Sequence, residues 1–552
     1  MTSLTKTCKN CAKPFAIAPE DTEFYKKIDV ATPTLCPTCR SQRRQAFRNE
    51  FFLYTRKCDF SGKEIISMYS QEKPYKIYDQ EIWWSDKWDP TTYGRDFDFN
   101  RPFFEQFIEL QKVVPRISLN CINNQNSYFT NYAFNNKNCY LIFTTDYCED
   151  SYYGRLNYRN FKCVDADYTS DSIHSYQISD ADRANNCLFC QKITGSSNLT
   201  FCYDMKNCHD CIGCSNLRSA RRYIFNKQVS QEEFEEFKAK MDLGSYNNLE
   251  KITKQFADMV ESKCPKKYLE NVNCDECVGN HLKSSKNAKM CFDSEKLHDI
   301  KFGTQLTDAK DCYDWDFVAA GGELCYEMVS CAYRMVSCKF CVNSWDGNSN
   351  ITYCDLCLGN KDLFGCIGMR KKQYCILNKQ YEKEEYDKLL AKIIEHMKKT
   401  GEWGEFFPIT SSPFAYNESV ANEFFTLTEE QIKEKGWSFK EPDKKEFKKQ
   451  TYLIPDHIKD VPNTITQEIL ACEKCGKNYK IIEQELAFYK ESNLPIPHKC
   501  HLCRHRGRTA KRSPRMIWKR TCSKCKIEIQ TTYSPNNPSP ILCEKCYLDL
   551  VG

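Results

Sequence analysis

Twelve of the 36 cysteines form C-x2-C pairs near the two ends of the chain. Two such pairs together offer four thiolates, and a tetrahedron of four soft ligands is the geometry that zinc prefers. A site closed in this way has no open position for a substrate, so we expect it to stabilise the fold and not to catalyse a reaction. The sequence predicts three zinc ions, held by Cys8, Cys11, Cys36 and Cys39, by Cys472, Cys475, Cys500 and Cys503, and by Cys522, Cys525, Cys543 and Cys546.

The two ends of the chain are copies of one double zinc-ribbon module. Each cysteine of the second site lies 464 residues after its counterpart in the first. At the same offset, the four cysteines of the third site fall on Cys58, Ser61, Asp79 and Ile82. One cysteine cannot hold zinc, so we predict that residues 56–84 keep a ribbon shape through the packing of their aromatic and aliphatic side chains.

Clusters of basic residues follow the cysteine pairs. Helical spacing places the arginines of RSQRRQAFR on one face, and these are Arg40, Arg43, Arg44 and Arg48. The segment 504–520 has no acidic residue and eight basic ones, namely Arg504, Arg506, Arg508, Lys511, Arg512, Arg515, Lys519 and Arg520. Trp518 lies among them and could stack on a base. Because the net charge of the chain is only +5, these local clusters carry the prediction of phosphate contacts.

Two competing interpretations of the segment 504–520 remain open. It could be a solvated surface, or it could dock on an acidic segment of the same chain such as 149–167, EDSYYGRLNYRNFKCVDAD.

The segment 126–227 repeats every twelve residues. Asn138-Cys139-Tyr140, Asp150-Ser151-Tyr152 and Lys162-Cys163-Val164 are three successive units, each with a polar, a small and a bulky residue. A fixed short period indicates a solenoid, and units of this length and composition favour a β-solenoid. Serine and cysteine alternate at the small position, which favours a coil of 24 residues over one of twelve.

The repeat occurs a second time. Residues 350–380 match residues 198–228 at a constant offset of 152, and counting backwards extends the second array to about residue 287. Each array is followed by an amphipathic segment, 230–241 and 381–399. We predict that both segments form helices that cover the last unit of their own array, since an open end would invite strand addition.

The cysteines inside the repeats are predicted to fill the core. Cys208, Cys211 and Cys214 have a spacing that could suit a metal, but Cys208 and Cys211 correspond to Asn360 and Leu363 in the second array. A metal site does not tolerate leucine in place of a ligand, whereas a packed interior does.

No catalytic motif occurs in the sequence, such as a Walker loop, a G-x-S-x-G nucleophile turn or H-E-x-x-H. The first array is rich in aspartate at Asp146, Asp165, Asp167, Asp171, Asp180 and Asp182. Paired carboxylates could act on a polysaccharide, but Asp is also a common turn residue. We favour turns and no enzymatic activity.

The chain resembles a family of large, functionally uncharacterised bacterial zinc-ribbon proteins. The resemblance covers most of the chain and rests on WWSDKWDP, YGRDFDFNRPFFEQFIEL, the Asn-Cys-Tyr units, and the endings RSARRYIFNKQVSQEEFEEF and MRKKQYCILNKQYEKEEYDKL. It implies an architecture but no activity. In that family the second ribbon usually has four cysteines, and this chain departs from that pattern at Ser61, Asp79 and Ile82.

The predicted fold is mainly β, with two tandem β-solenoid-like repeat domains and their capping helices between zinc-ribbon modules. The predicted N-terminal parts are a double ribbon with a degenerate second ribbon (1–84) and an aromatic linker that docks this ribbon on a solenoid (85–120). The first solenoid with its capping helix (121–245), a helical linker (246–272) and the second solenoid with its capping helix (273–400) follow. A connector (401–470) leads to the C-terminal double ribbon (471–552).

The predicted function is nucleic-acid binding by a non-enzymatic zinc-ribbon protein, with RNA or a ribosomal site favoured over specific DNA and the solenoids as a rigid scaffold. A catalytic or carbohydrate-binding solenoid and a pure protein-interaction scaffold are the alternatives, and a protein partner could bind a solenoid face. The start of the chain has no apolar signal region and no long apolar run follows. We therefore expect no membrane association, and the zinc-spaced thiols favour a cytoplasmic location.

Overall fold

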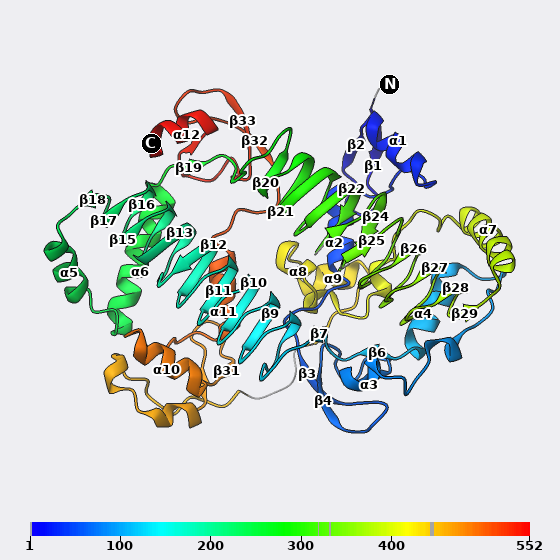
Figure 1. Cartoon of the computed structure of the whole chain (residues 1–552), viewed down its shortest axis with the longest axis horizontal. Coiled ribbons are helices and arrows are strands. Elements are labelled where there is room, and N and C mark those ends of the chain that lie inside the picture. Colours follow the sequence, from blue (N-terminus) through cyan, green and yellow to red (C-terminus); the bar gives the residue numbers. More distant parts are fainter. Residues whose placement is uncertain (1–2, 318–319, 331–332, 442–446) are drawn as a thin grey trace. The chain divides into compact units, whose positions relative to one another are not determined.

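The computed structural model describes residues 3–317, 320–330, 333–441 and 447–552, so part of the predicted connector, 442–446, lies outside the described residues (Figure 1). The chain forms two compact units that do not follow its order. Unit 1 consists of Met1–Leu119, Leu269–Glu441 and Arg515–Ile517, and unit 2 of Asn120–Tyr268, Pro442–Pro514 and Trp518–Gly552. The N-terminal module thus belongs with the second array, and the C-terminal module with the first.

The first array is a ladder of parallel strands in unit 2 (Figure 1). Each residue pairs with the residue twelve positions further on, as in Tyr140↔Tyr152, Tyr152↔Val164 and Val164↔Tyr176. The strands are β7 (Cys121–Ile122), β8 (Asn131–Phe134), β9 (Tyr140–Asp146), β10 (Tyr152–Tyr158), β11 (Val164–Ser170), β12 (Tyr176–Asn185), β13 (Gln191–Thr200), β14 (Tyr203–Lys206), β15 (His209–Ile212), β16 (Ser215–Arg218), β17 (Arg221–Ile224) and the antiparallel β18 (Lys227–Gln228).

The second array, in unit 1, is built in the same way. Its register is eleven residues at the start of the array, as at Asp275↔Lys286, and twelve at most later steps. It is thirteen at the successive steps Cys312↔Cys325, Tyr326↔Lys339 and Lys339↔Thr352. The strands are β20 (Val278–Lys283), β21 (Lys286–Lys301), β22 (Thr307–Trp315), β23 (Ala320–Gly321), β24 (Cys325–Met328), β25 (Tyr333–Met335), β26 (Ser349–Thr352), β27 (Lys361–Phe364), β28 (Gln373–Ile376) and β29 (Lys379–Gln380).

The register of twelve shows that the expected 24-residue coil is wrong. Serine and cysteine alternate for a local reason, which is a hydrogen bond between neighbouring units. The backbone N–H of Cys163 donates to Ser151 Oγ at 3.2 Å, and Cys187 N–H donates to Ser175 Oγ at 3.1 Å. The serine hydroxyl accepts from the backbone of the next unit, whereas the cysteine thiol of that unit donates to a backbone oxygen, as Cys163 Sγ does to Ser172 O at 3.3 Å.

Within each unit the backbone has a period of three. Asn135, Asn138, Leu141 and Thr144 all have φ between 51° and 54°, in the left-handed region. The residue that follows each of them is buried, and three of these residues are Asn136, Cys139 and Ile142. A left-handed conformation costs an L-residue about 1–2 kcal/mol, and Asn and Asp tolerate it best. This explains why Asn and Asp recur at these positions.

Helices cover the last units of both arrays, as the sequence predicted. Helix α5 (Gln231–Lys240) begins with a capping box of Ser230 and Glu233, and its Phe237 ring lies 5.8 Å from Phe225. Helix α7 (Lys383–Thr400) packs in the same way, with the ring centre of Tyr386 at 5.8 Å from that of Tyr374.

The N-terminal module lies within unit 1. It comprises β1 (Leu4–Thr7), β2 (Pro14–Ile17), α1 (Pro19–Lys27), α2 (Pro37–Gln45), β3 (Tyr54–Lys57), β4 (Glu64–Ser67), β5 (Ile77–Tyr78) and α3 (Gln80–Trp84), followed by a 3-10 turn η1 (Pro90–Tyr93), α4 (Phe103–Val113) and β6 (Arg116–Ile117). The expected aromatic docking seam is confirmed by contacts between aromatic side chains. The ring centre of Trp83 lies 5.4 Å from that of Trp345, and the ring centre of Phe103 lies 5.2 Å from that of Phe364 in the second array.

The C-terminal module comprises β30 (Leu470–Ala471), β31 (Asn478–Tyr479), α10 (Glu483–Glu491), α11 (His501–Thr509), β32 (Trp518–Thr521), β33 (Glu528–Thr531), β34 (Ile541–Leu542) and α12 (Glu544–Val551). The remaining elements are α6 (Tyr246–Ser262), β19 (Lys266–Lys267), α8 (Ala421–Phe424), α9 (Glu429–Glu434) and the 3-10 turns η2 (Ile409–Ser411), η3 (Tyr416–Glu418), η4 (Ile458–Asp460) and η5 (Asn463–Gln467). Among the helices of the described residues, none has both the length and the apolar character that crossing a membrane requires.

Candidate zinc centres and the helices they hold

In the described part of the chain, three groups of four cysteines have converging sulfur atoms. They are the three predicted sets, and in each set all four sulfurs lie within 4.8 Å of one another. The distances Cys11 Sγ–Cys36 Sγ, Cys475 Sγ–Cys500 Sγ and Cys525 Sγ–Cys543 Sγ are 3.9, 3.8 and 3.7 Å. A tetrahedron with zinc–sulfur bonds of about 2.3 Å has sulfur–sulfur distances of about 3.8 Å. The three sites therefore fit zinc.

The second cysteine pair of each site lies at the start of a helix and not in a second hairpin. Cys36, Cys500 and Cys543 are the N-cap residues of α2, α11 and α12. The first pair of each site lies in the turn of a two-stranded hairpin, β1–β2, β30–β31 or β32–β33. One hairpin and one helix thus supply the ligands of each site, so a bound ion would be tied directly to a helix.

Local hydrogen bonds favour the thiolate form of Cys36 in the first site and of Cys472 in the second. The Cys39 thiol donates to Cys36 and lowers the pKa of Cys36 to about 5. Burial acts to raise the pKa of Cys472, but the backbone amides of Cys500 and Cys475 outweigh it and lower this pKa to about 6. The partial positive charge at a helix N-terminus acts in the same direction.

The degenerate fourth site keeps the backbone of the other three. The Asp79 N–H donates to Cys58 Sγ at 3.3 Å, as Cys36 N–H does to Cys8 Sγ at 3.3 Å and Cys543 N–H to Cys522 Sγ at 3.4 Å. The carboxylate of Asp79 caps α3 by accepting from Glu81 N–H at 3.0 Å. Hydrogen bonding and packing thus preserve the frame at a position where the ligands are lost.

Restoring the missing ligands should create a fourth zinc site. We expect the combined change Ser61→Cys, Asp79→Cys and Ile82→Cys to raise the zinc content of purified protein by one equivalent, because the frame already places these positions as in the third site. Elemental analysis by mass spectrometry measures this. The single change Ser61→Cys is the matched control and should add none, and equal zinc content in both variants would contradict the preserved frame.

The predicted basic face of α2 is buried against the second array. Arg40 Nε lies 2.9 Å from Asp314 Oδ2, and Arg44 bridges Asp314 at 2.9 Å and Asp316 at 2.8 Å. Both arginines are at most 2% exposed. Arg43 pairs with Glu327 at 2.6 Å, and Arg48 pairs with Glu50 at 2.6 Å while its guanidinium lies over the ring of Phe317. These arginines are therefore oriented away from solvent.

Helix α11 makes the same contacts with the first array. Arg504 Nε lies 2.7 Å from Asp165 Oδ2, and Arg508 bridges Asp165 at 2.9 Å and Asp167 at 2.6 Å. His505 Nδ1 lies 3.0 Å from the other oxygen of Asp167. Burial would raise the pKa of Asp167, but the charges of Arg508 and His505 hold it well below its ordinary value.

The rest of the basic segment is divided between internal contacts and solvent. Arg512 pairs with Asp180 at 2.7 Å, Arg515 pairs with Asp293 at 2.9 Å, and Arg520 donates to the backbone oxygen of Ser534 at 2.8 Å. Trp518 is half-buried in β32, and the side chains that remain exposed are Arg506, Lys511 and Lys519.

The aspartates that receive the arginines include residues of the expected turns, since Asp165 and Asp314 lie at left-handed corners with φ of 57° and 59° and also pair with arginine. Asp165 and Asp167 in the first array correspond to Asp314 and Asp316 in the second, an Asp-x-Asp pair repeated at an offset of 149. The arginines recur as Arg-x3-Arg at the module offset of 464. The sequence therefore contained a signal for these contacts, because the Asp-x-Asp pair and the Arg-x3-Arg pair recur together. Among the interpretations of the segment 504–520, docking on the acidic segment 149–167 accounts for Arg504 and Arg508.

The cysteines inside the arrays line the core, as predicted. Cys187, Cys202 and Cys211 are each 0% exposed. Their thiols lie against backbone carbonyls, for example Cys202 Sγ at 3.5 Å from the oxygens of Thr200 and Cys211. Burial raises the pKa of the Cys187 thiol to about 12, which keeps it protonated.

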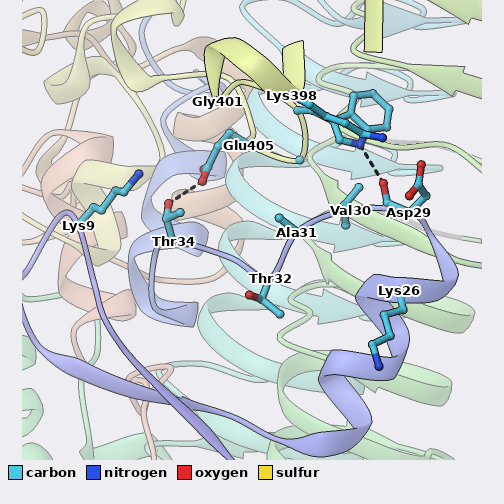
Figure 2. A pocket seen from close by; sticks show the side chains of 12 residues that line it. Lys9, Lys26, Asp29, Val30, Ala31, Thr32, Thr34, Lys398, Gly401 and Glu405 are labelled. Carbon is cyan, nitrogen blue, oxygen red and sulfur yellow. Dashed lines mark hydrogen bonds between the residues drawn. The ribbon is translucent and has the colours of Figure 1, made fainter. Parts of the chain in front are cut away.

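A cavity of about 500 Å³ lies in unit 1 between the loop after α1 and the end of α7 (Figure 2). Lys9, Lys26 and Lys398 stand at its rim, and Thr34 Oγ1 donates to Glu405 Oε1 at 2.7 Å across it. Its titratable residues form no nucleophile–base pair, so the cavity gives no support to a catalytic function.

Comparisons with known proteins identify one part of the chain. Residues 4–48 match a family model described as "Probable treble clef domain", which agrees with the hairpin-and-helix arrangement of the first site. No curated protein matches the chain. A solved structure titled as that of a "putative acetyltransferase" from Desulfovibrio desulfuricans G20 is similar over 45% of this chain and 63% of its own, at 8% identity and a TM-score of 0.11. The chain thus spans less than two thirds of that protein, and a similarity this low carries no argument.

Proposed function

We propose that this protein is a non-enzymatic zinc-dependent scaffold, in which zinc-bound helices lock two β-solenoids into fixed shapes that bind a macromolecular partner. One observation carries the proposal. In both units the helix that supplies two zinc ligands continues directly into two arginines, and these are buried against an Asp-x-Asp pair of the array. The zinc sites therefore act on the arrays and are not independent ribbons.

The ladder geometry supports the solenoid interpretation. A parallel register of twelve residues, left-handed corners every third residue and one buried residue after each corner are what a narrow coil of twelve residues requires. Such a coil buries only about four side chains per turn, and these must be small or slender. Cysteine is the commonest residue in the cores of both arrays, beside alanine, isoleucine, leucine and methionine, with Trp315 as a large exception, and this accounts for the high cysteine content.

Zinc and the ion pairs depend on each other for a physical reason. Burying a carboxylate or guanidinium costs several kcal/mol unless a partner compensates it. The pairs in both units require the helix to start at a fixed point and run in a fixed direction, and the cysteines of its first turn set both. Without zinc, the carboxylates on the array would lose their ordered partners and would have to be hydrated.

Chelation of zinc provides the test. After incubation of the full chain with a strong chelator, we expect hydrogen exchange to increase in α2, α11 and the facing strands β22 and β11, while β15 and β27, which carry no Asp-x-Asp pair, keep their protection. Zinc added back should restore the protection. If exchange increased only in the hairpins and helices that carry cysteines, the arrays would not depend on zinc and the proposal would be wrong.

The exposed surface of the first array favours a protein as the macromolecular partner. Tyr147, Tyr158, Phe161 and Ile173 lie on adjacent units and are each 39–56% exposed. Aromatic and aliphatic side chains in such a cluster are typical of interaction surfaces. A catalytic role for the carboxylates of the array has less support than a scaffold role. Asp165 and Asp167 pair with arginines of α11, and Asp180 pairs with Arg512. The described cysteines are all free thiols, which suits the cytoplasmic location that we propose.

Nucleic-acid binding is the second candidate function, and it rests on Arg506, Lys511 and Lys519, which remain exposed in the C-terminal module. Substituting all three by alanine should reduce the slope of log affinity against log salt by about 0.7 per lost contact for single strands or about 0.9 for duplex DNA. Filter binding or fluorescence anisotropy with unrelated RNA and DNA sequences measures this.

The matched control for nucleic-acid binding is the exposed pair of Lys137 and Glu149 on the first array. Lys137→Ala should leave the salt slope unchanged. Absence of binding by the unaltered protein at ~50 mM salt and micromolar concentration would eliminate the nucleic-acid function, without affecting the scaffold.

A further inference from the structure

The two module–array interfaces share one set of contacts and differ in a second. The shared set is the arginine pair on the Asp-x-Asp pair, with Arg40 and Arg44 in unit 1 and Arg504 and Arg508 in unit 2. On these contacts alone, either module could dock on either array. The duplicated chain thus needs another feature to direct each module.

The difference lies beside the shared contacts. In the second array Glu327 occupies the unit after Asp314, and Arg43 of α2 pairs with it at 2.6 Å. The corresponding residue of the first array is Gln177, whose amide lies 3.5 Å from Asp165 Oδ2. The residue of α11 that corresponds to Arg43 is Gly507, at the offset of 464. The two positions that form an ion pair in unit 1 are therefore occupied by uncharged residues in unit 2.

We propose that Arg43–Glu327 and Gly507–Gln177 are the specificity-determining pairs that direct the N-terminal module to the second array and the C-terminal module to the first. This holds whether or not the arrays bind a further partner. If α11 docked on the second array, Glu327 would face Gly507 and lose the cation that Arg43 supplies. If α2 docked on the first array, Arg43 would face the neutral Gln177.

Burial makes such a mismatch unfavourable. Glu327 is 0% exposed, and burial raises its pKa against the opposing charge of Arg43. Asp314 lies one unit away, so an unpaired Glu327 would add a second carboxylate at the same site. Gln177 presents no charge and tolerates a helix without a side chain at position 507. The surroundings of Gly507 also leave room for a longer residue, because an added Cβ there meets no atom within 4 Å.

Rescue by paired substitutions tests the proposal in the full chain. Zinc release to a colorimetric chelator measures docking, because a detached helix exposes its site. We expect Arg43→Ala to accelerate release of one zinc equivalent by about tenfold, and Arg43→Ala with Glu327→Gln to return the rate to within about threefold of the unaltered protein. In unit 2, Gln177→Glu should accelerate release of a different equivalent by about tenfold, and Gly507→Arg added to it should reverse most of the effect.

Two controls make the outcome decisive. Gly507→Arg alone should leave all three release rates unchanged, because position 507 is exposed. Mass spectrometry of alkylated cysteines assigns each release phase to its site. The proposal is overturned if either double variant releases zinc as fast as its faster single variant, or if all variants match the unaltered protein. Variants that fail to fold in both single and double form would also overturn it, because rescue is then absent.

Discussion

Asp314→Ala should lower the free energy of unfolding of unit 1 by about 3–5 kcal/mol, since it removes the carboxylate that serves Arg40 and Arg44 together. Both guanidinium groups are buried, and in the variant Arg40 would lose its carboxylate while Arg44 would keep only Asp316. Removal of one member of a buried pair is costly for this reason, even where the intact pair contributes little. Denaturant unfolding followed by tryptophan fluorescence measures the change, because seven of the eight tryptophans lie in the residues of unit 1.

The matched control is another aspartate of the second array. Asp275 pairs with Lys286 at 3.6 Å, and both side chains are more than half exposed. Asp275→Ala should therefore change the free energy of unfolding by only about 0–1 kcal/mol. If the two variants unfolded at the same denaturant concentration, the contacts of α2 with the array would not stabilise unit 1, and the proposed lock would have no energetic basis.

Cys503→Ser should reduce the zinc content from three equivalents to two and detach α11 from the first array. A closed structural site uses four protein ligands, so we expect a site with three thiolates to lose its ion. The apparent binding free energy of about 10–16 kcal/mol that such an ion contributes to folding would be lost with it. Arg504 follows this cysteine directly and binds Asp165. Loss of zinc should therefore extend to β11, with increased hydrogen exchange and protease cleavage in the segment 501–517.

Cys187→Ala is the control for Cys503→Ser, because it removes a cysteine of the core and not a zinc ligand. Its sulfur lies inside the first array and is fully buried, so the substitution should leave three zinc equivalents and cost about 1–2 kcal/mol through the small cavity it creates. A zinc content below three in this variant would show that the array cysteines bind metal. An unchanged zinc content in Cys503→Ser would remove the assignment of the second site.

The sequence by itself determined the zinc ligands and the repeat. Zinc coordination is local chemistry with a fixed ligand number, so C-x2-C pairs and their duplication at an offset of 464 were sufficient to select the twelve cysteines. The period of twelve was visible in the sequence, but the alternation at Cys139, Ser151 and Cys163 favoured a coil of 24 residues, and only the strand pairing showed that the register is twelve. The three-residue period was also present in the sequence, as in Cys208, Cys211 and Cys214, but its spacing coincides with that of metal ligands.

Only the tertiary structure decided where the charges point. Arg504 and Arg508 have the same local sequence chemistry whether they face phosphate or carboxylate, and Asp165 and Asp167 lie more than 300 residues away in the chain. Composition and spacing describe one partner at a time, while a buried ion pair requires both partners and the exclusion of water between them. For the same reason the sequence order places the N-terminal module next to the first array, and yet its arginines bind the second. Pairing between distant segments is chosen by complementary surfaces and not by proximity along the chain.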